Sequence, residues 1–188
     1  QDEAAIEAAG IKSLKPLMDA IDGIRRQKDI APAIARLHAL GMPVLVDVQV
    51  LRDDKGQPYA QVGAGGLGLP GAGFYTGGEP ELAAVRTQYK AALAEWLRHG
   101  GVAPKDVAAQ AEGAWQFELI LANATAAGTP FQVMKIEDAT KVAGGLQLQG
   151  LLAAHGLKAS QVAMTGPAFF RALDQMINRN KPEQWRAY

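Results

Sequence analysis

Residues 79–101 read EPELAAVRTQYKAALAEWLRHGG and form the clearest helical pattern in the sequence. Pro80 suits the first turn of a helix, where its missing N–H group leaves no bond unmade, and Gly100-Gly101 is typical of a helix end. Between these signals one apolar stripe follows the 3.6-residue period and comprises Leu82, Val85, Tyr89, Ala92, Leu93 and Trp96. The stretch therefore predicts an amphipathic helix of about five turns.

A second long helix is expected over residues 104–126, because apolar side chains again recur at spacings of three and four. The side chains expected to be buried are Val107, Ala111, Ala114 and Leu121, with Trp115, Leu119 and Ala122 beside them. Only a short glycine-rich turn separates this helix from the first. The two are therefore predicted to form a long antiparallel hairpin.

Shorter helical patterns flank this hairpin. Residues 14–24 and 29–40 are expected to be helices, with Asp29 capping the second one and Gly41 ending it. Downstream, helices are expected near residues 136–142, 146–155 and 167–178, while residues 160–164 can be extended.

The two ends of the sequence resemble interrupted helices. Residues 2–9 are typical of a helix tail that stops at Gly10. Near the other end, Asn180 is expected to cap a helix that has Pro182 in its first turn and Glu183 closing a capping box. Because that helix has a start signal and no stop signal, we expect the sequence to be an excerpt of a longer protein.

Between residues 43 and 63 the apolar period changes from that of a helix to that of a strand. Alternating valines occupy residues 44–50, Asp53-Asp54-Lys55-Gly56 supplies a turn, and residues 59–62 resume an extended run. An isolated hairpin is marginal in water, so it must pack on a helix or a partner strand. The predicted fold is therefore mainly α, a helical lobe with a long antiparallel helix hairpin and one small β-hairpin.

Composition excludes several classes of function. The 188 residues carry 19 Lys and Arg against 19 Asp and Glu, so no basic surplus is available for nucleic acid or an anionic membrane. The longest apolar runs fall far short of the ~20 residues that a membrane helix needs. With no cysteine, the chain can form neither a disulfide nor a thiolate metal site.

The run Gly63-Ala64-Gly65-Gly66-Leu67-Gly68 satisfies the G-x-G-x-x-G pattern and follows a predicted strand. A dinucleotide-binding loop requires a helix that begins within the motif, so that its N-terminus faces the pyrophosphate. Here Leu69-Pro70-Gly71 prolongs an irregular segment instead. We therefore interpret the glycines as backbone devices of a structural loop and keep nucleotide binding as the weakest alternative.

Neither a metal site nor a catalytic constellation is predicted in this chain. His38, His99 and His155 lie on separate helices or helix ends, H-E-x-x-H is absent, and each histidine is expected at a surface or helix end. Ser13 and Ser160 are typical of turn or cap residues. The chain alone is therefore expected to bind no zinc and to hydrolyse no peptide.

Glu118 is the carboxylate that stands out, because it is flanked by Trp115, Phe117 and Leu119 on the second long helix. A buried carboxylate can act as an acid catalyst or serve as the structural partner of a cation such as Arg86. No second acidic group is in view. We therefore favour the structural role for Glu118.

The segment Gly66-Leu67-Gly68-Leu69-Pro70, followed by Phe74-Tyr75, resembles the G-L-G-L-P-x-x-x-Y-Y segment of the neprilysin and endothelin-converting-enzyme family of zinc endopeptidases. Further landmarks follow the family's order along nearly the whole chain. They are Pro16-Leu17, Ile21-Asp22-Gly23-Ile24, Leu37-His38-Ala39-Leu40-Gly41, the hairpin with Asp53, Val85-Arg86 with Tyr89, Phe117-Glu118-Leu119, Leu121-Ala122, Phe169-Phe170 and Trp185-Arg186-Ala187-Tyr188. The chain departs from the family at Gly71-Ala72-Gly73, where an Arg-Asp pair is usual, and at Val46, where Phe is common.

The resemblance implies that residues 1–188 are part of one helical, substrate-enclosing domain of a longer peptidase whose zinc-binding catalytic domain is absent from this chain. The whole enzyme would cut small peptides with a zinc-activated water. This lobe would act as a cavity wall and size filter, with a structural loop (Gly66, Leu67, Gly68, Leu69, Pro70 and Tyr75) and with Glu118 as a structural buried carboxylate.

The same resemblance implies zinc in the full-length enzyme and no cofactor in this chain. The expected partners are the remaining catalytic domain and small peptide substrates, without nucleic acid or a membrane span. A cysteine-free member of this family is expected to be bacterial and periplasmic or secreted. The alternative is a stand-alone helical module that binds a peptide or a protein.

Overall fold

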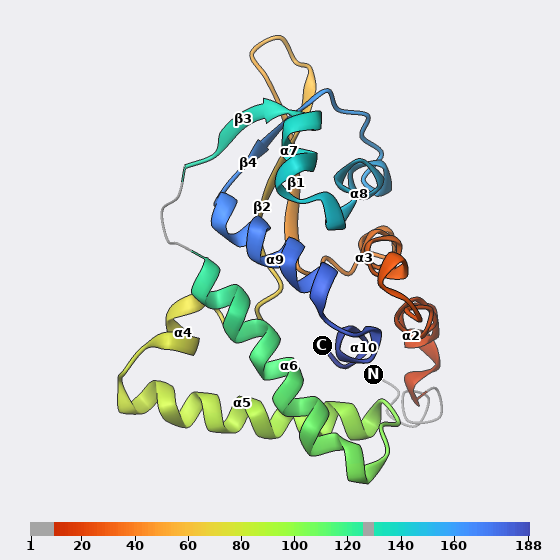
Figure 1. The fold of residues 1–188 in the computed structure, drawn as a ribbon, viewed down its shortest axis with the longest axis vertical. Coiled ribbons are helices and arrows are strands. Elements are labelled where there is room, and N and C mark those ends of the chain that lie inside the picture. Colours follow the sequence, from red (N-terminus) through yellow and green to blue (C-terminus); the bar gives the residue numbers. More distant parts are fainter. Residues whose placement is uncertain (1–9, 126–129) are drawn as a thin grey trace, which may run out of the picture.

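The computed structural model describes residues 10–125 and 130–188, so the expected helix tail at residues 2–9 and the last residue of the expected 104–126 helix lie outside the described residues. The fold is mainly α (Figure 1). Its helices are α2 (Lys15–Asp22), α3 (Ile30–Ala39), α4 (Ala72–Thr76), α5 (Pro80–His99), α6 (Pro104–Ala124), α7 (Ile136–Val142), α8 (Leu148–Ala154), α9 (Pro167–Arg179) and α10 (Pro182–Ala187), with 3-10 turns η1 (Gly10–Leu14), η2 (Gln27–Asp29) and η3 (Gly144–Leu146). Its strands are β1 (Val46–Arg52), β2 (Pro58–Ala64), β3 (Gln132–Lys135) and β4 (Gln161–Met164).

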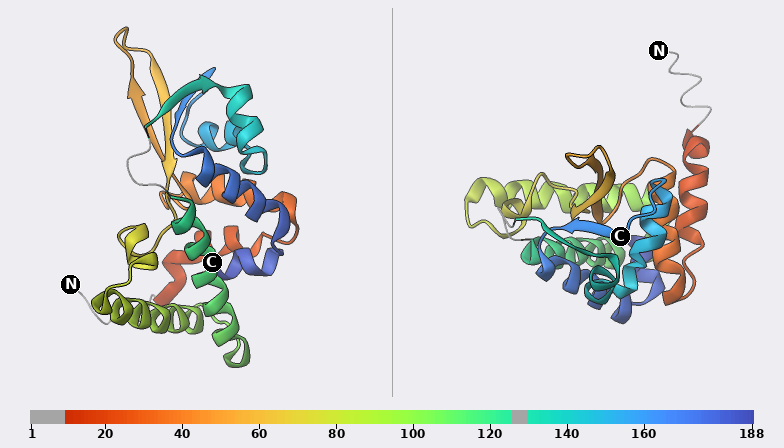
Figure 2. Two further views of the ribbon diagram at one scale, coloured as in Figure 1. Left: turned by 60° about the vertical axis from the view of Figure 1, so that its left-hand side comes forward. Right: turned by 90° about the horizontal axis from the view of Figure 1, so that it is seen from above.

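The long helix hairpin is confirmed. Helices α5 and α6 each begin with a proline, run in opposite senses and diverge obliquely from their connecting turn (Figures 1 and 2). The expected stripe of α5 buries Tyr89 and Leu93, whereas Trp96 at its end is 59% exposed. Short helix α4 packs against both long helices where they have separated.

The sheet is larger than the predicted hairpin. Strands β1 and β2 form that hairpin, with Val46 opposite Ala64, and its turn projects beyond the helices (Figure 2). Strand β4 then pairs parallel to β2, and β3 pairs antiparallel to β4, giving the order β1-β2-β4-β3. Strand β3 escapes prediction because its four residues are too few to display a period, and its central Val133 is exposed.

Two hydrophobic clusters meet at α6. The larger one joins the sheet to α3, α7, α8 and α9, and it receives Phe117 and Leu121 from α6. The smaller one lies within the α4–α5–α6 wedge and receives Ala114 and Trp115 from the same helix. Leu67, in the loop after β2, packs against both clusters. Consequently α6 is the shared wall of two cores, which explains why it is apolar on most of its surface.

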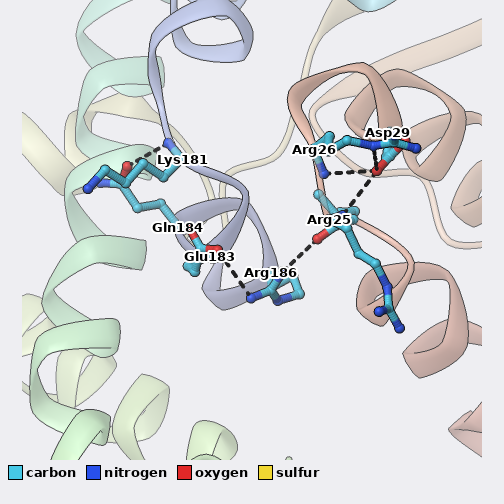
Figure 3. Close-up of polar contacts among 8 residues, drawn as sticks. Arg25, Arg26, Asp29, Lys181, Glu183, Gln184 and Arg186 are labelled. Carbon is cyan, nitrogen blue, oxygen red and sulfur yellow. Dashed lines mark hydrogen bonds and ion pairs between the residues drawn. The ribbon is translucent and has the colours of Figure 1, made fainter.

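Two predicted caps are corrected by the structure (Figure 3). Asp29 makes no side-chain cap on α3, because its carboxylate accepts the N–H groups of Arg25 and Arg26 at 3.2 and 2.8 Å. Gly41 does end α3, with φ of 83°.

The cap of α10 also differs from the prediction that named Asn180 and Glu183. Lys181 is its N-cap residue, and the Lys181 N–H donates to Gln184 Oε1 at 2.9 Å. On the same helix, Arg186 Nη1 donates to the Ile24 carbonyl at 2.6 Å and thereby ties α10 to the connection after α2 (Figure 3). Within the described ranges, no helix combines the length and hydrophobicity needed to cross a membrane.

Candidate functional site

The GLGLP loop, defined as residues 66–70, lies between β2 and α4 where the two cores meet. Gly66 has φ of 75°, and a Cβ there would lie 2.7 Å from Leu45 Cα and overlap the Tyr188 hydroxyl. A Cβ at Gly68 would overlap the hydroxyl of Tyr89. Both positions therefore require glycine, one for its backbone conformation and both for close approach.

Glu118 of α6 holds this loop from the side of the helix hairpin. The residue is 5% exposed, and its carboxyl group accepts the Gly68 N–H at 3.1 Å and the Tyr75 hydroxyl, both at Oε2. The Tyr89 hydroxyl donates to the same carboxyl group, 2.8 Å from Oε1 and 3.0 Å from Oε2. Leu69 N–H in turn donates to the Tyr75 hydroxyl at 2.9 Å. The loop, α4 and α5 thus converge on one carboxylate, which we call the Glu118 clamp.

The expected cation is replaced by neutral donors. Arg86 donates from Nη1 to the carbonyls of Phe74 and Gly77 at 3.1 and 2.9 Å, where it fixes the end of α4. Across residues 10–125 and 130–188, no ion pair includes Glu118. Hydrogen bonds to a buried carboxylate offset part of the cost of removing it from water, and here two hydroxyls and one N–H supply them.

The two tyrosines of the clamp are permanent donors. Burial, followed by the hydrogen bond to Glu118, raises the pKa of Tyr75 and of Tyr89 above the ordinary value. Both rings also pack on the indole of Trp115. The Tyr75 ring is stacked on it with ring centroids 5.1 Å apart, and the Tyr89 ring meets it edge-on with ring centroids 6.3 Å apart. The clamp is therefore a closed polar network inside an aromatic shell, an arrangement that fixes geometry.

Tyr188 holds the loop from the opposite side. Its hydroxyl donates to the Gly66 carbonyl at 2.5 Å, and its ring packs on Phe117 of α6 at 5.5 Å. Burial, with the charge of Glu118 as a smaller cause, raises the pKa of Tyr188 as well. A residue 122 positions away in sequence thus completes the anchoring of Gly66.

The geometry of the loop disfavours nucleotide binding. The Gly65 N–H is bonded to the Leu45 carbonyl at 3.1 Å and the Gly68 N–H to Glu118, so two N–H groups that a phosphate would need are already engaged. The adjacent carboxylate would also repel a phosphate. Helix α4 begins only at Ala72 and has five residues. The N–H groups of this loop therefore bind other parts of the chain and are not free to bind a phosphate.

The histidines lie at helix ends, as predicted, but two of them meet. His38, in the last turn of α3, is 6% exposed, and its Nδ1 lies 2.9 Å from Nε2 of His155, which directly follows α8. His99 lies apart at the exposed end of α5. Within the described ranges, no group of three or more His, Asp or Glu side chains could hold a metal ion. These residues do not fit a zinc site.

Comparison with known proteins gives one family match and several structural matches. The family model described as Peptidase family M13, which represents the N-terminal part of that family, matches residues 1–188. No curated protein matches the chain by sequence.

Solved structures share the fold. The zinc metalloprotease Zmp1 of Mycobacterium tuberculosis, in complex with an inhibitor, has a TM-score of 0.86 and 21% identity over 99% of this chain. The same protein in an open state gives the same values. PepO of Lactobacillus rhamnosis HN001 has a TM-score of 0.75 and 20% identity over 96% of this chain. The chain spans 30% of the length of each of these structures. Because the family model covers all of its residues, the chain belongs to peptidase family M13, the neprilysin-like metallopeptidases, and corresponds to their N-terminal part.

Proposed function

We propose that this chain is the non-catalytic helical lobe of a zinc-dependent endopeptidase that cuts small peptides, and that it serves as a cavity wall and size filter. The observation that carries the proposal is the family match over residues 1–188 together with the fold shared with Zmp1 at a TM-score of 0.86. Zmp1 is named as a zinc metalloprotease, and its structures include an open state and an inhibitor complex.

The packing around Glu118 and the GLGLP loop supports a structural role for this region more than a catalytic one. The carboxylate that stands out in the sequence, Glu118, is buried and bonded to three donors, two of which are tyrosines that pack on Trp115. The GLGLP loop is fixed from two sides by Glu118 and Tyr188. Such fixed packing between two cores is what a rigid enclosing surface requires. Zinc and the general base would be supplied by a catalytic domain that is the partner of this lobe, in a bacterial protein that is periplasmic or secreted.

The experiment uses the intact protein and a matched pair of substrates. One is a peptide of about ten residues, and the other carries the same cleavage sequence inside a folded protein domain. The proposal predicts zinc-dependent cleavage of the peptide and at least a hundredfold slower cleavage of the embedded sequence. Equal rates would refute the size filter, and binding of peptides without any cleavage would favour the alternative, a helical binding module.

A further inference from the structure

The His38–His155 pair, in which His38 is buried and His155 half-buried, lies outside the Glu118 clamp and joins two helices far apart in sequence. His38, near the end of α3, and His155, directly after α8, share a hydrogen bond of 2.9 Å and meet edge-on with ring centroids 5.2 Å apart. The other ring nitrogen of His38, Nε2, lies 2.8 Å from the Val44 carbonyl and 3.1 Å from the Val44 N–H. His38 therefore connects α8 to the residues that lead into β1.

The hydrogen bonds of the pair limit how many protons it can carry. Nε2 of His38 either donates to the Val44 carbonyl or accepts the Val44 N–H, and in both neutral tautomers the contact between His38 Nδ1 and His155 Nε2 holds one proton. One additional proton is tolerated, because an imidazolium at His38 can donate from both nitrogens. A second one would place two N–H groups and two positive charges face to face and break the bond.

The residue after Val44 is backbone-strained. Leu45 is 1% exposed and has φ of 65°, a conformation that side chains other than glycine rarely adopt. The Val46 N–H donates back to the Val44 carbonyl at 2.7 Å, which makes residues 44–46 a tight γ-turn. A strained turn persists only when its surroundings hold it. Here His38 holds its first residue.

The same turn supports the GLGLP loop. The Leu45 carbonyl accepts the Gly65 N–H at 3.1 Å, and Gly66 approaches Leu45 so closely that a Cβ would lie 2.7 Å from Leu45 Cα. A continuous set of contacts thus runs from His155 through His38 and the γ-turn to the loop. From these contacts we propose that the His38–His155 pair is a proton-sensitive latch, which holds the contacts between Leu45 and the start of the GLGLP loop at neutral pH and releases them in acid.

The charges around the pair are accounted for on each element packed against α3 and α8. Asp47 of β1 acts on His155 and favours its imidazolium form, against the effect of His38. Other charged groups on these elements are bound to partners of their own. Lys15 pairs with Asp19 on α2 and Lys141 with Asp138 on α7, while Asp29 of η2 accepts the Arg25 and Arg26 N–H groups and Asp174 of α9 accepts the Gly145 N–H. Arg36, Glu137 and Lys158 are exposed to solvent.

The direction of the pH response follows from the folded state. Burial, and secondarily the charge of His38, lowers the pKa of His155 below its ordinary value of 6.5. An opened latch binds the proton more readily than a closed one, so the closed form is favoured above that value and loses stability as the pH falls below it. The largest expected change is about a tenfold rise in the opening equilibrium between pH 7.5 and 5.5.

The test is amide hydrogen exchange in the intact protein, corrected for the intrinsic pH dependence of exchange. The Gly65 amide reports the loop, and the Gly100 amide, bonded to Trp96 at the end of α5, is the internal reference. We expect the opening equilibrium at Gly65 to rise up to about tenfold from pH 7.5 to 5.5 while that at Gly100 changes by less than about twofold. An unchanged Gly65 value in the wild-type protein would overturn the latch without any variant.

A pair of variants assigns the response to the histidines. His155→Gln keeps a side-chain donor near His38 and cannot titrate, so the acid response at Gly65 should fall to less than about twofold. His99→Gln, at the exposed end of α5, should retain the full response. A full response in His155→Gln would overturn the proposal. The readout is independent of peptidase activity, so the latch and the proposed function can fail separately.

Discussion

Two polar clusters among the described residues, the Glu118 clamp and the His38–His155 pair, perform similar tasks with different chemistry. Each fixes one side of the GLGLP region, and each joins segments that are apart in the sequence. The clamp uses tyrosine hydroxyls whose pKa is raised by burial, whereas the pair includes an imidazole, that of His155, whose pKa is lowered by burial. If the latch operates as proposed, the contacts of the loop with Glu118 and Tyr188 persist in acid, whereas its contacts with Leu45 depend on pH.

The largest effect is expected for Gly68→Val, which removes the close approach that the clamp needs. The new side chain would overlap the Tyr89 hydroxyl and displace the loop from Glu118, so we expect a loss of about 3–5 kcal/mol in the free energy of unfolding. Urea denaturation measures it. Gly71→Val is the control, because φ there is extended and a Cβ meets no atom within 4 Å. Equal losses in the two variants would contradict the close-packed loop.

A smaller effect is expected for Tyr89→Phe. The change deletes one donor to Glu118 and leaves the ring packing on Trp115 in place, which should cost about 1–3 kcal/mol of stability. Urea denaturation measures this loss. The control is Tyr59→Phe, near the turn of the β-hairpin, which should leave the free energy of unfolding almost unchanged. If Tyr89→Phe is equally neutral, the clamp does not depend on its second tyrosine.

A smaller effect on stability is expected at alkaline pH, where the tyrosines of the clamp respond and the histidine pair does not. Because the folded-state pKa of Tyr89 is raised above the ordinary 10.0, the unfolded chain loses the phenol proton first, and stability falls as the pH rises above about 10. Stability measured from pH 8 to pH 11 should decline less steeply in Tyr89→Phe than in the wild type. Identical slopes would mean that this hydroxyl does not report on folding.

The smallest effect is expected from nucleotides. Since the Gly65 and Gly68 N–H groups are engaged and a carboxylate lies beside them, millimolar NAD or ATP should leave the melting temperature where an equal ionic strength of salt leaves it. Thermal denaturation with and without each nucleotide decides this. A specific upward shift would restore the dinucleotide interpretation of the glycine motif.

Sequence reasoning succeeded where the signals are local. The α5–α6 hairpin follows from apolar period, Pro80 and the closing glycines, and the β1–β2 hairpin follows from alternation and its turn. Glu118 was also identifiable as unusual, because a carboxylate among large apolar residues must find partners. Its actual partners were not identifiable, since Tyr75 and Tyr89 are indistinguishable by sequence from ordinary core aromatics.

The remaining features depend on contacts that no local pattern encodes. Strand β4 joins β2 across about a hundred residues, His38 meets His155 across 117, and Tyr188 reaches Gly66 across 122. The left-handed Leu45 gave no signal at all, because leucine is a residue from which positive φ is not expected. The features that the sequence did not predict are therefore those that depend on contacts between residues far apart in the chain.

We expect Glu118 to be a structural clamp that takes no part in chemistry. Its direct test is Glu118→Gln in the intact protein, with peptide hydrolysis normalised to folded protein and a urea melt in parallel. We expect a loss of about 1–3 kcal/mol in the free energy of unfolding, because the amide cannot accept all the donors that surround it, and an almost unchanged turnover per folded molecule. A hundredfold fall in turnover with the melt unmoved would contradict it and assign this carboxylate to catalysis.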